Sequence, residues 1–191
     1  MSGRLPTPNK QLLSKVLKYK NPEVVARFCK EQGVSKKNAT VIFKDLLRFL
    51  WLSNRKHYLN SKRKDQVYDL HPFPMLFAFV IVDEMWHTFI LFTGDYVNFC
   101  QKYFRKSILH HVPESIHKHD RNSKVVDHEQ IRKKANDLIR FVSSELGESV
   151  ARRWFVNYPR EYSLAKIRKS KYVASGTDAM LIRQQKAQKA A

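Results

Sequence analysis

Apolar residues recur at three- and four-residue spacing along much of the chain, which is the period of an amphipathic helix. No strand alternation or hairpin signal competes with this pattern over a comparable length. The predicted helices are about 9–19, 21–33, 35–53, 75–92 and 95–105, then a long helix that opens at 123 or 127 and ends at 146, and one more before Pro159. The sequence therefore predicts an all-α, single multi-helix domain around a buried central helix, with basic flexible termini.

The helix predicted over 21–33 carries the clearest end signals. Asn21 is a favourable N-cap, Pro22 suits the first turn, and Glu23 lies near the positive end of the helix dipole. Gly33 follows the last apolar position and can take the left-handed conformation that closes a helix. We therefore expect this helix to begin and end at these residues.

The most apolar stretch runs from residue 75 to residue 93. Its first part, 75–82, is apolar on all sides and would also suit a strand, but the whole run is too long for one. Asp83, Glu84 and His87 stand in its middle, where a bilayer would penalise charge heavily. We therefore expect a buried central helix over 75–92 and no transmembrane segment.

Asp83 and His87 form the first candidate site. They are four residues apart, so a helix brings both side chains to one face. With His110 or His111 they would form a two-histidine, one-carboxylate set suited to zinc or to non-haem Fe(II), as in a hydrolase or an oxygenase. In the alternative, His87 donates to Asp83 beneath Trp86 and the pair is purely structural. Whether the protein is an enzyme stays open.

The residues around this pair carry a resemblance. The string VDEMWHTFIL at 82–91, followed by a tyrosine, a cysteine and the HHVP of 110–113, resembles a bacterial group related to the glycine-rich domain-containing protein-like family. That group's hallmark is Asp-x-x-Trp-His on a helix, and residues 147–159 are similar to its closing segment. The resemblance spans about 72–162 and implies a helical domain with a poorly defined activity.

Composition limits the other possibilities. The chain has 191 residues, 43% of them hydrophobic and 12% aromatic, which suffices for one buried core and excludes general disorder. Its two cysteines, Cys29 and Cys100, form no CxxC pair, which argues against a disulfide scaffold and favours a reducing interior. The first ten residues contain no apolar signal segment. A cytoplasmic location is therefore expected.

Charge supplies the second functional hypothesis. The chain holds 36 Lys and Arg against 17 Asp and Glu, a net charge of +19 that is concentrated in residues 1–20, 54–64 and 162–191. Such basic segments are typical of proteins that bind nucleic acid or another polyanion through phosphates. The predicted phosphate contacts are Lys10, Lys15, Lys18, Lys62, Arg63, Lys64, Arg168, Lys169 and Lys171. In this alternative the Asp83–His87 pair has no role beyond structure.

The same charge distribution suggests how the chain is divided. We expect a basic N-terminal arm with a short helix over 1–20, a helical domain over 21–162 and a basic, mobile tail over 163–191. No P-loop, dinucleotide-binding or nucleophile-elbow motif is present, and no helix-turn-helix is recognisable. Nucleic-acid binding would therefore have little sequence specificity and would weaken steeply with salt.

Overall fold

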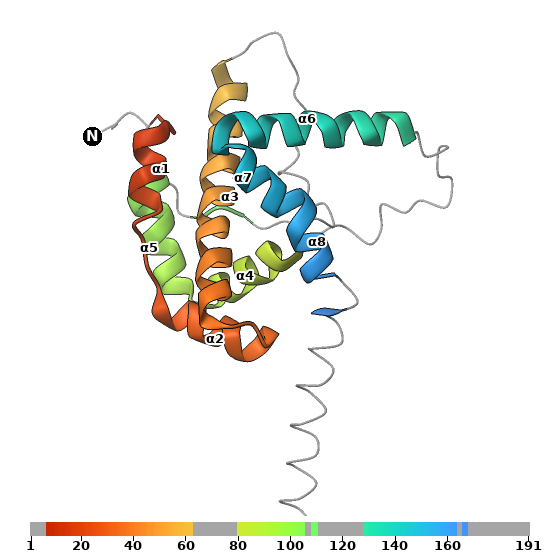
Figure 1. Cartoon of the computed structure of the whole chain (residues 1–191). Coiled ribbons are helices and arrows are strands. Elements are labelled where there is room, and N and C mark those ends of the chain that lie inside the picture. Colours follow the sequence, from red (N-terminus) through yellow and green to blue (C-terminus); the bar gives the residue numbers. More distant parts are fainter. Residues whose placement is uncertain (1–6, 63–79, 106–107, 111–127, 164–165, 168–191) are drawn as a thin grey trace, which may run out of the picture.

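The computed structural model describes residues 7–62, 80–105, 108–110, 128–163 and 166–167 (Figure 1). The elements within these ranges are α1 (Lys10–Val16), α2 (Pro22–Gln32), α3 (Lys36–Lys62), α4 (Val80–Leu91), α5 (Thr93–Phe104), α6 (His128–Leu146), α7 (Glu148–Arg152), the π-helical turn η3 (Arg153–Asn157) and α8 (Tyr158–Glu161). This described part contains helices and no strand. The all-α prediction is confirmed.

Helix α3 organises the packing. It is the longest helix, with 27 residues, and α1, α2, α4 and α6 all contact it. In Figure 1 it stands in the middle, with α1 and α5 on one side and α7 and α8 on the other. Helix α4 is largely buried, as expected, and packs between α2, α3 and α5. Because other helices pack around α3, its polar side chains can bond to residues of several neighbouring helices.

The ends of α2 follow the sequence signals. The side chain of Asn21 accepts a hydrogen bond from the backbone N–H of Val24 at 3.1 Å. Gly33 closes the helix in the left-handed region, with φ of 63°. Asn21 also donates to Oδ2 of Asp95 in α5 at 2.8 Å, so the same cap ties two helices together. The predicted helix over 21–33 is confirmed.

Two helix boundaries differ from the prediction. Helix α3 continues to Lys62 rather than ending near residue 53, because residues 54–62 contain no glycine or proline and Arg55 pairs with Glu145 of α6 at 3.2 Å. At the other end of the chain, η3 leads directly into α8, which contains Pro159 and continues to Glu161. Proline is tolerated there because it stands in the first turn of α8, where a missing backbone N–H costs no hydrogen bond.

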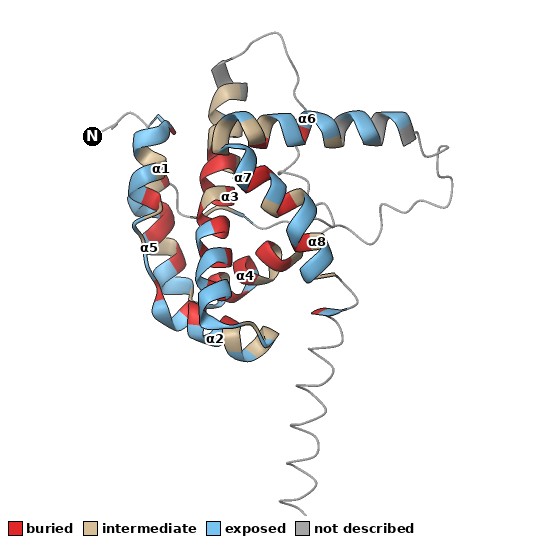
Figure 2. Cartoon of the chain, in the orientation of Figure 1, coloured by how far each residue is buried: buried red, intermediate tan, exposed pale blue. Residues whose placement is uncertain are grey.

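Aromatic side chains fill the core between α1, α3, α4 and α5. The ring centroid of Phe89 lies 5.6 Å from that of Phe43 and 5.6 Å from that of Phe99. Tyr19, just after α1, closes the group at 5.0 Å from Phe99. Figure 2 shows the buried residues in red along the facing sides of these helices. These rings, in tilted and edge-to-face contact and buried apart from the partly exposed Tyr19, fix the relative positions of the four segments.

The two expected terminal segments are described in part. The N-terminal helix α1 packs on the core: Val16 is fully buried, and Lys10 contacts Glu145 of α6 through both the backbone carbonyl and the carboxylate. Of the expected tail, Ser163, Lys166 and Ile167 are described, and Ile167 is buried. Residues 168–191 lie outside the described residues. No helix in the described ranges combines the length and apolarity that crossing a membrane requires.

Candidate functional site

Asp83 and His87 lie on the outward side of α4. Nδ1 of His87 is 3.9 Å from Oδ2 of Asp83, beyond hydrogen-bond range, and the side chains are 50% and 24% exposed. The expectation that both groups lie in the interior is wrong for His87. The helix turns Trp86 and Phe89 inward, and the four-residue spacing then leaves 83 and 87 together on its wetter face.

His110 follows a segment that is fixed by a buried hydrogen-bond chain. The indole N–H of Trp86 donates to the Tyr96 hydroxyl at 3.0 Å, and that hydroxyl donates to the Leu109 carbonyl. Burial is the main reason that the pKa of Tyr96 is raised, so the phenol stays protonated. His110 itself is exposed. The Trp of the Asp-x-x-Trp-His motif therefore has a structural role that the sequence did not reveal.

The metal hypothesis has no complete ligand set in the described part of the chain. Within those ranges, no three His, Cys, Asp or Glu side chains come together to hold a metal ion, so His110 does not complete a set with Asp83 and His87. His111 lies outside the described residues. A zinc or Fe(II) site at these positions stays a prediction.

Four of the nine predicted phosphate contacts fall within the described residues. Lys15 and Lys18 are exposed at α1 and just after it, while Lys10 is held by Glu145 and lies 5.5 Å from the Trp51 ring centroid. Lys62 is the last residue of α3. The other predicted contacts lie outside the described residues: Arg63, Lys64, Arg168, Lys169 and Lys171.

The structure also contains a densely bonded polar group that sequence reasoning missed. Asp45 of α3 is fully buried, and both of its carboxylate oxygens accept hydrogen bonds. Arg153 donates from Nε at 2.6 Å and from Nη2 at 2.8 Å, Arg48 from Nη1 at 2.7 Å, and the Tyr158 hydroxyl at 2.6 Å. We call Asp45, Arg48, Arg153 and Tyr158 the Asp45 cluster. It joins α3 to η3 and α8.

The Asp45 cluster brings more basic than acidic groups together and presents a net positive surface. The hydrogen bonds to Asp45 are the main reason that the pKa of Arg153 is raised, and burial followed by the charge of Asp45 raises the pKa of Tyr158. One carboxylate faces two guanidinium groups. The side chains of Arg48 and Arg153 are 21% and 26% exposed, so the excess positive charge meets solvent.

One sequence signal points to Asp45. It is the sole acid in the 27 residues of α3, it stands among apolar positions, and a base follows three residues later on the same side. A lone carboxylate in such a setting needs a partner. The partners Arg153 and Tyr158 are 108 and 113 residues away in sequence, so no local pattern identifies them.

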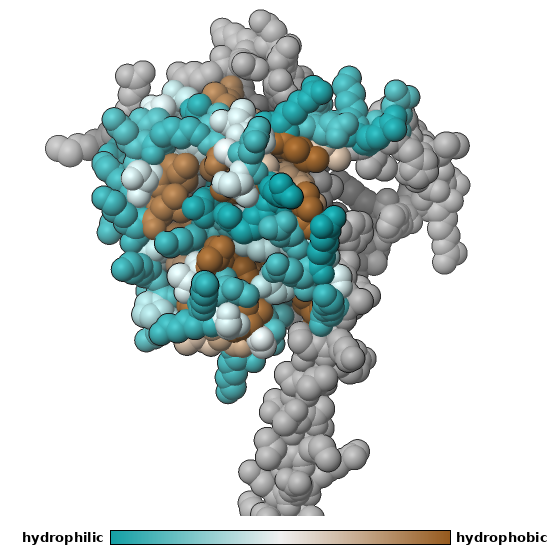
Figure 3. Space-filling view, in the orientation of Figure 1, coloured by the Kyte–Doolittle hydropathy of each residue, from teal (hydrophilic) through white to brown (hydrophobic). Residues whose placement is uncertain are grey.

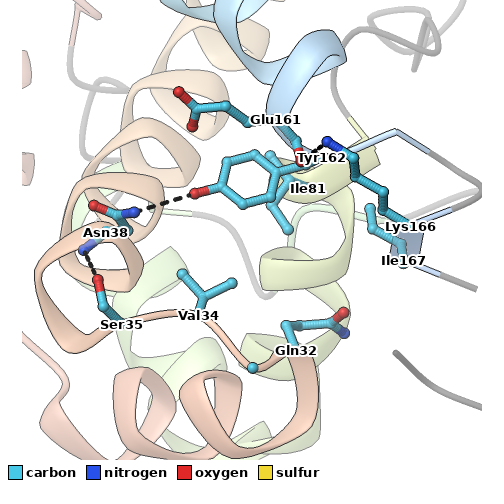
Figure 4. Close-up of a pocket in the computed structure, with 10 residues that line it drawn as sticks. Gln32, Val34, Ser35, Asn38, Ile81, Glu161, Tyr162, Lys166 and Ile167 are labelled. Carbon is cyan, nitrogen blue, oxygen red and sulfur yellow. Dashed lines mark hydrogen bonds between the residues drawn. The ribbon is translucent and has the colours of Figure 1, made fainter. Parts of the chain in front are cut away.

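A cleft of about 290 Å³ opens between the end of α2, the start of α3 and α8 (Figure 4). Its polar groups largely satisfy one another. Asn38 donates from Nδ2 to the Tyr162 hydroxyl at 3.5 Å and from its backbone to Ser35 Oγ at 3.3 Å, while Lys166 Nζ donates to the carbonyls of Arg160 and Glu161. The cleft therefore presents few uncommitted donors for a ligand.

Comparison with known proteins identifies a family and no closer relative. The family model described as UCP032817-like matches residues 16–134. No curated protein and no solved structure matches the chain. The resemblance to the glycine-rich domain-containing protein-like family is therefore wrong: the matched range includes the Asp-x-x-Trp-His string, but five residues on one helix are too few to separate the two groups.

Proposed function

Because the chain belongs to the UCP032817-like family, whose name states no activity, we propose a function from its surface: it binds nucleic acid through the phosphate backbone, without reading sequence. Lys15, Lys18, Lys102 and Arg105 form the contact face. We call these four residues the α1–α5 face. The observation that carries the proposal is that these four bases are exposed on two neighbouring segments, while Asp45 and Glu145 are each held by two bases elsewhere in the fold.

The acids with an ion-pair partner in α2, α3 and α6 lie away from this face. Asp45 is enclosed in the Asp45 cluster, Glu145 is held between Lys10 and Arg55, and Glu31 pairs with Arg27 at 2.7 Å. By contrast, many bases on the described helices are exposed: Lys15, Lys18, Lys30, Lys36, Lys37, Lys44, Lys102, Arg105, Arg140, Arg152 and Arg160. A protein with this distribution presents a positive field to polyanions.

The α1–α5 face is held together by packing beneath it. Figure 1 shows α1 and α5 side by side, and the Tyr19 ring lies 5.0 Å from Phe99 and 6.2 Å from Tyr103, centroid to centroid. Lys15 and Lys18 are three residues apart on the outward side of the first segment, as Lys102 and Arg105 are on the second. Two rows of bases on a rigid support suit successive phosphates of one strand.

Arg105 adds a conformational argument. It closes α5 in the left-handed region, with φ of 52°, where a residue with a Cβ is strained and glycine is favoured. The chain retains an exposed arginine at this strained position, beside Lys102. Backbone strain that persists at a polar surface residue is typical of a functional position.

The experiment is a salt titration of binding to a labelled DNA duplex of about 20 base pairs by fluorescence anisotropy. We expect the affinity to fall at least tenfold (about 1.4 kcal/mol) between roughly 50 and 200 mM salt, linearly on a double logarithmic plot. Absence of binding near 50 mM salt, or binding that is flat across this range, contradicts the proposal.

Arg105→Gly provides the sharpest variant. It relieves the left-handed strain, so the free energy of unfolding should rise by about 0.5–1 kcal/mol while DNA affinity falls about threefold or more. Arg27→Gln, which removes one charge on α2, is the matched control and should change affinity less. Equal losses in the two variants would show that net charge, and not the α1–α5 face, determines binding.

A further inference from the structure

The two arginines of the Asp45 cluster are held side by side. Nη1 of Arg48 and Nη2 of Arg153 both donate to Oδ1 of Asp45, at 2.7 and 2.8 Å. Arg153 adds a second bond from Nε to Oδ2, which fixes the plane of its guanidinium group. Because Asp45 is fully buried and its other oxygen also accepts from Tyr158, the carboxylate is a fixed anchor for both groups.

Each guanidinium keeps donors that Asp45 does not use. A guanidinium carries five N–H groups. The bonds to Asp45 leave Nε and Nη2 of Arg48 and Nη1 of Arg153 as donors that the carboxylate does not use, and the Arg153 guanidinium also interacts with the Tyr158 hydroxyl. Both side chains remain partly exposed, at 21% and 26%. The pair therefore presents unused donors and one uncompensated positive charge to solvent.

Exposed bases stand on the helices that carry this pair, and α7 and α8 also carry the exposed acids Glu148 and Glu161. Lys37 and Lys44 are exposed on α3, and Lys44 stands one helical turn before Arg48 on the same side. Arg152, the neighbour of Arg153, is exposed on α7. Figure 1 places α7 beside α3, and Figure 3 shows hydrophilic side chains in teal across this front of the molecule. No acid besides the enclosed Asp45 stands on α3.

We propose that Arg48 and Arg153 form a phosphate-binding fork, with Asp45 as its positioning residue. Two neighbouring guanidinium groups can donate to several oxygens of one phosphodiester, and a phosphate supplies the negative charge that the Asp45 cluster lacks. The buried carboxylate holds the two side chains in place before binding, so less side-chain order is lost when the anion arrives. The identity of the phosphate carrier, a nucleic-acid strand, rests on the proposed function, and the fork is a second contact site on the α7–α8 side of α3, apart from the α1–α5 face.

Arg48 is the residue to change, because it makes one bond to Asp45 whereas Arg153 makes two and supports the fold. We expect Arg48→Gln to weaken binding of the full chain to the DNA duplex about five- to tenfold and to reduce the salt slope by about one phosphate contact. Arg48→Lys keeps the charge but not the planar donors and should lose at least about twofold. Arg27→Gln, matched in charge, should stay within about twofold.

Inorganic phosphate gives a second readout that does not need DNA. Phosphate should raise the Tm of the wild-type chain above its value in chloride at equal ionic strength, and Arg48→Gln should abolish this difference. If the wild-type chain binds DNA but Arg48→Gln matches Arg27→Gln in both assays, the fork is overturned and the proposed function stands. If phosphate protects through Arg48 but DNA does not bind, the fork stands and the proposed function is overturned.

Discussion

The carboxylates of two acid–base pairs, Asp83 with His87 and Asp45 with Arg153, differ in burial and in hydrogen bonding. Asp83 and His87 stand in the most apolar stretch of the chain, yet His87 is half-exposed and its Nδ1 lies 3.9 Å from Oδ2 of Asp83. Asp45 stands in a helix that is less apolar overall, yet it is fully buried and bonded at 2.6–2.8 Å. Local apolarity along the sequence therefore does not predict which carboxylate lies inside.

The difference follows from what each carboxylate faces. The Asp83 side chain is 24% exposed, so water reaches it in part. Asp45 faces η3 and α8, and four donor atoms replace its water. A buried charge is tolerated when donors saturate it, and breaking such a pair leaves an uncompensated charge.

The largest expected effect comes from Asp45→Asn. It leaves two arginines beside a neutral amide, and we expect the free energy of unfolding to fall by about 3–5 kcal/mol. Asp83→Asn, the same chemical change on α4, should cost no more than about 1 kcal/mol because that side chain is solvated. Urea unfolding of both variants near neutral pH makes the comparison, and similar losses would contradict the distinction between the pairs.

Alkaline pH should weaken the fold next. The pKa values of buried Tyr96 and Tyr158 are raised above the ordinary value of 10.0, so the folded chain keeps protons that the unfolded chain loses. Stability is then complete below pH 10 and falls as pH rises above it, by about 1.4 kcal/mol per pH unit for each such tyrosine. Urea midpoints between about pH 8 and pH 11 test this, and a flat profile would contradict the burial of both phenols.

Tyr158→Phe removes one of the four bonds to Asp45 and keeps the packing of the ring. We expect a loss of about 1–2 kcal/mol in the free energy of unfolding at neutral pH and a shallower decline above pH 10. Tyr162→Phe is the control, because the partners of its hydroxyl, Asn38 at 3.5 Å and Glu161, are both exposed. A loss from Tyr162→Phe that equals the loss from Tyr158→Phe would show that the bond to Asp45 is unimportant.

A smaller effect is expected from Trp86→Phe, which leaves the Tyr96 hydroxyl with its bond to the Leu109 carbonyl but without its donor. The free energy of unfolding should fall by about 1 kcal/mol, beyond the cost of lost ring area. Hydrogen exchange of the amides in 108–110 should quicken in this variant and not in His87→Ala. Unchanged exchange rates would show that the Trp86 indole does not help to order residues 108–110.

The smallest effect is expected from His87→Ala, because a half-exposed side chain with a 3.9 Å contact contributes little. The free energy of unfolding should change by less than about 0.5 kcal/mol. Metal analysis of untagged protein sharpens this test. Stoichiometric zinc or iron that is lost in His87→Ala would establish the metal site predicted from sequence, and would overturn the structural reading of the pair.

Local chemistry was predictable from the sequence and distant pairing was not. Asn21 and Gly33 correctly predicted the ends of α2, because helix capping depends on residues within one turn. The extension of α3 to Lys62 was not predicted, because residues 54–62 form a basic segment. The contact that supports this part of the helix, between Arg55 and Glu145 of α6, is not visible in the sequence. Asp45 could be singled out as a lone acid, but its partners are more than 100 residues away and only the fold brings them together.

Paired double-mutant cycles test the contrast between the two acid–base pairs most directly. The single and double variants Asp45→Asn with Arg153→Gln, and Asp83→Asn with His87→Ala, would be unfolded in urea near neutral pH. The account predicts a coupling energy of at least about 2 kcal/mol between Asp45 and Arg153, and less than about 0.5 kcal/mol between Asp83 and His87. Additive losses at Asp45 and Arg153, or strong coupling on α4, would contradict it.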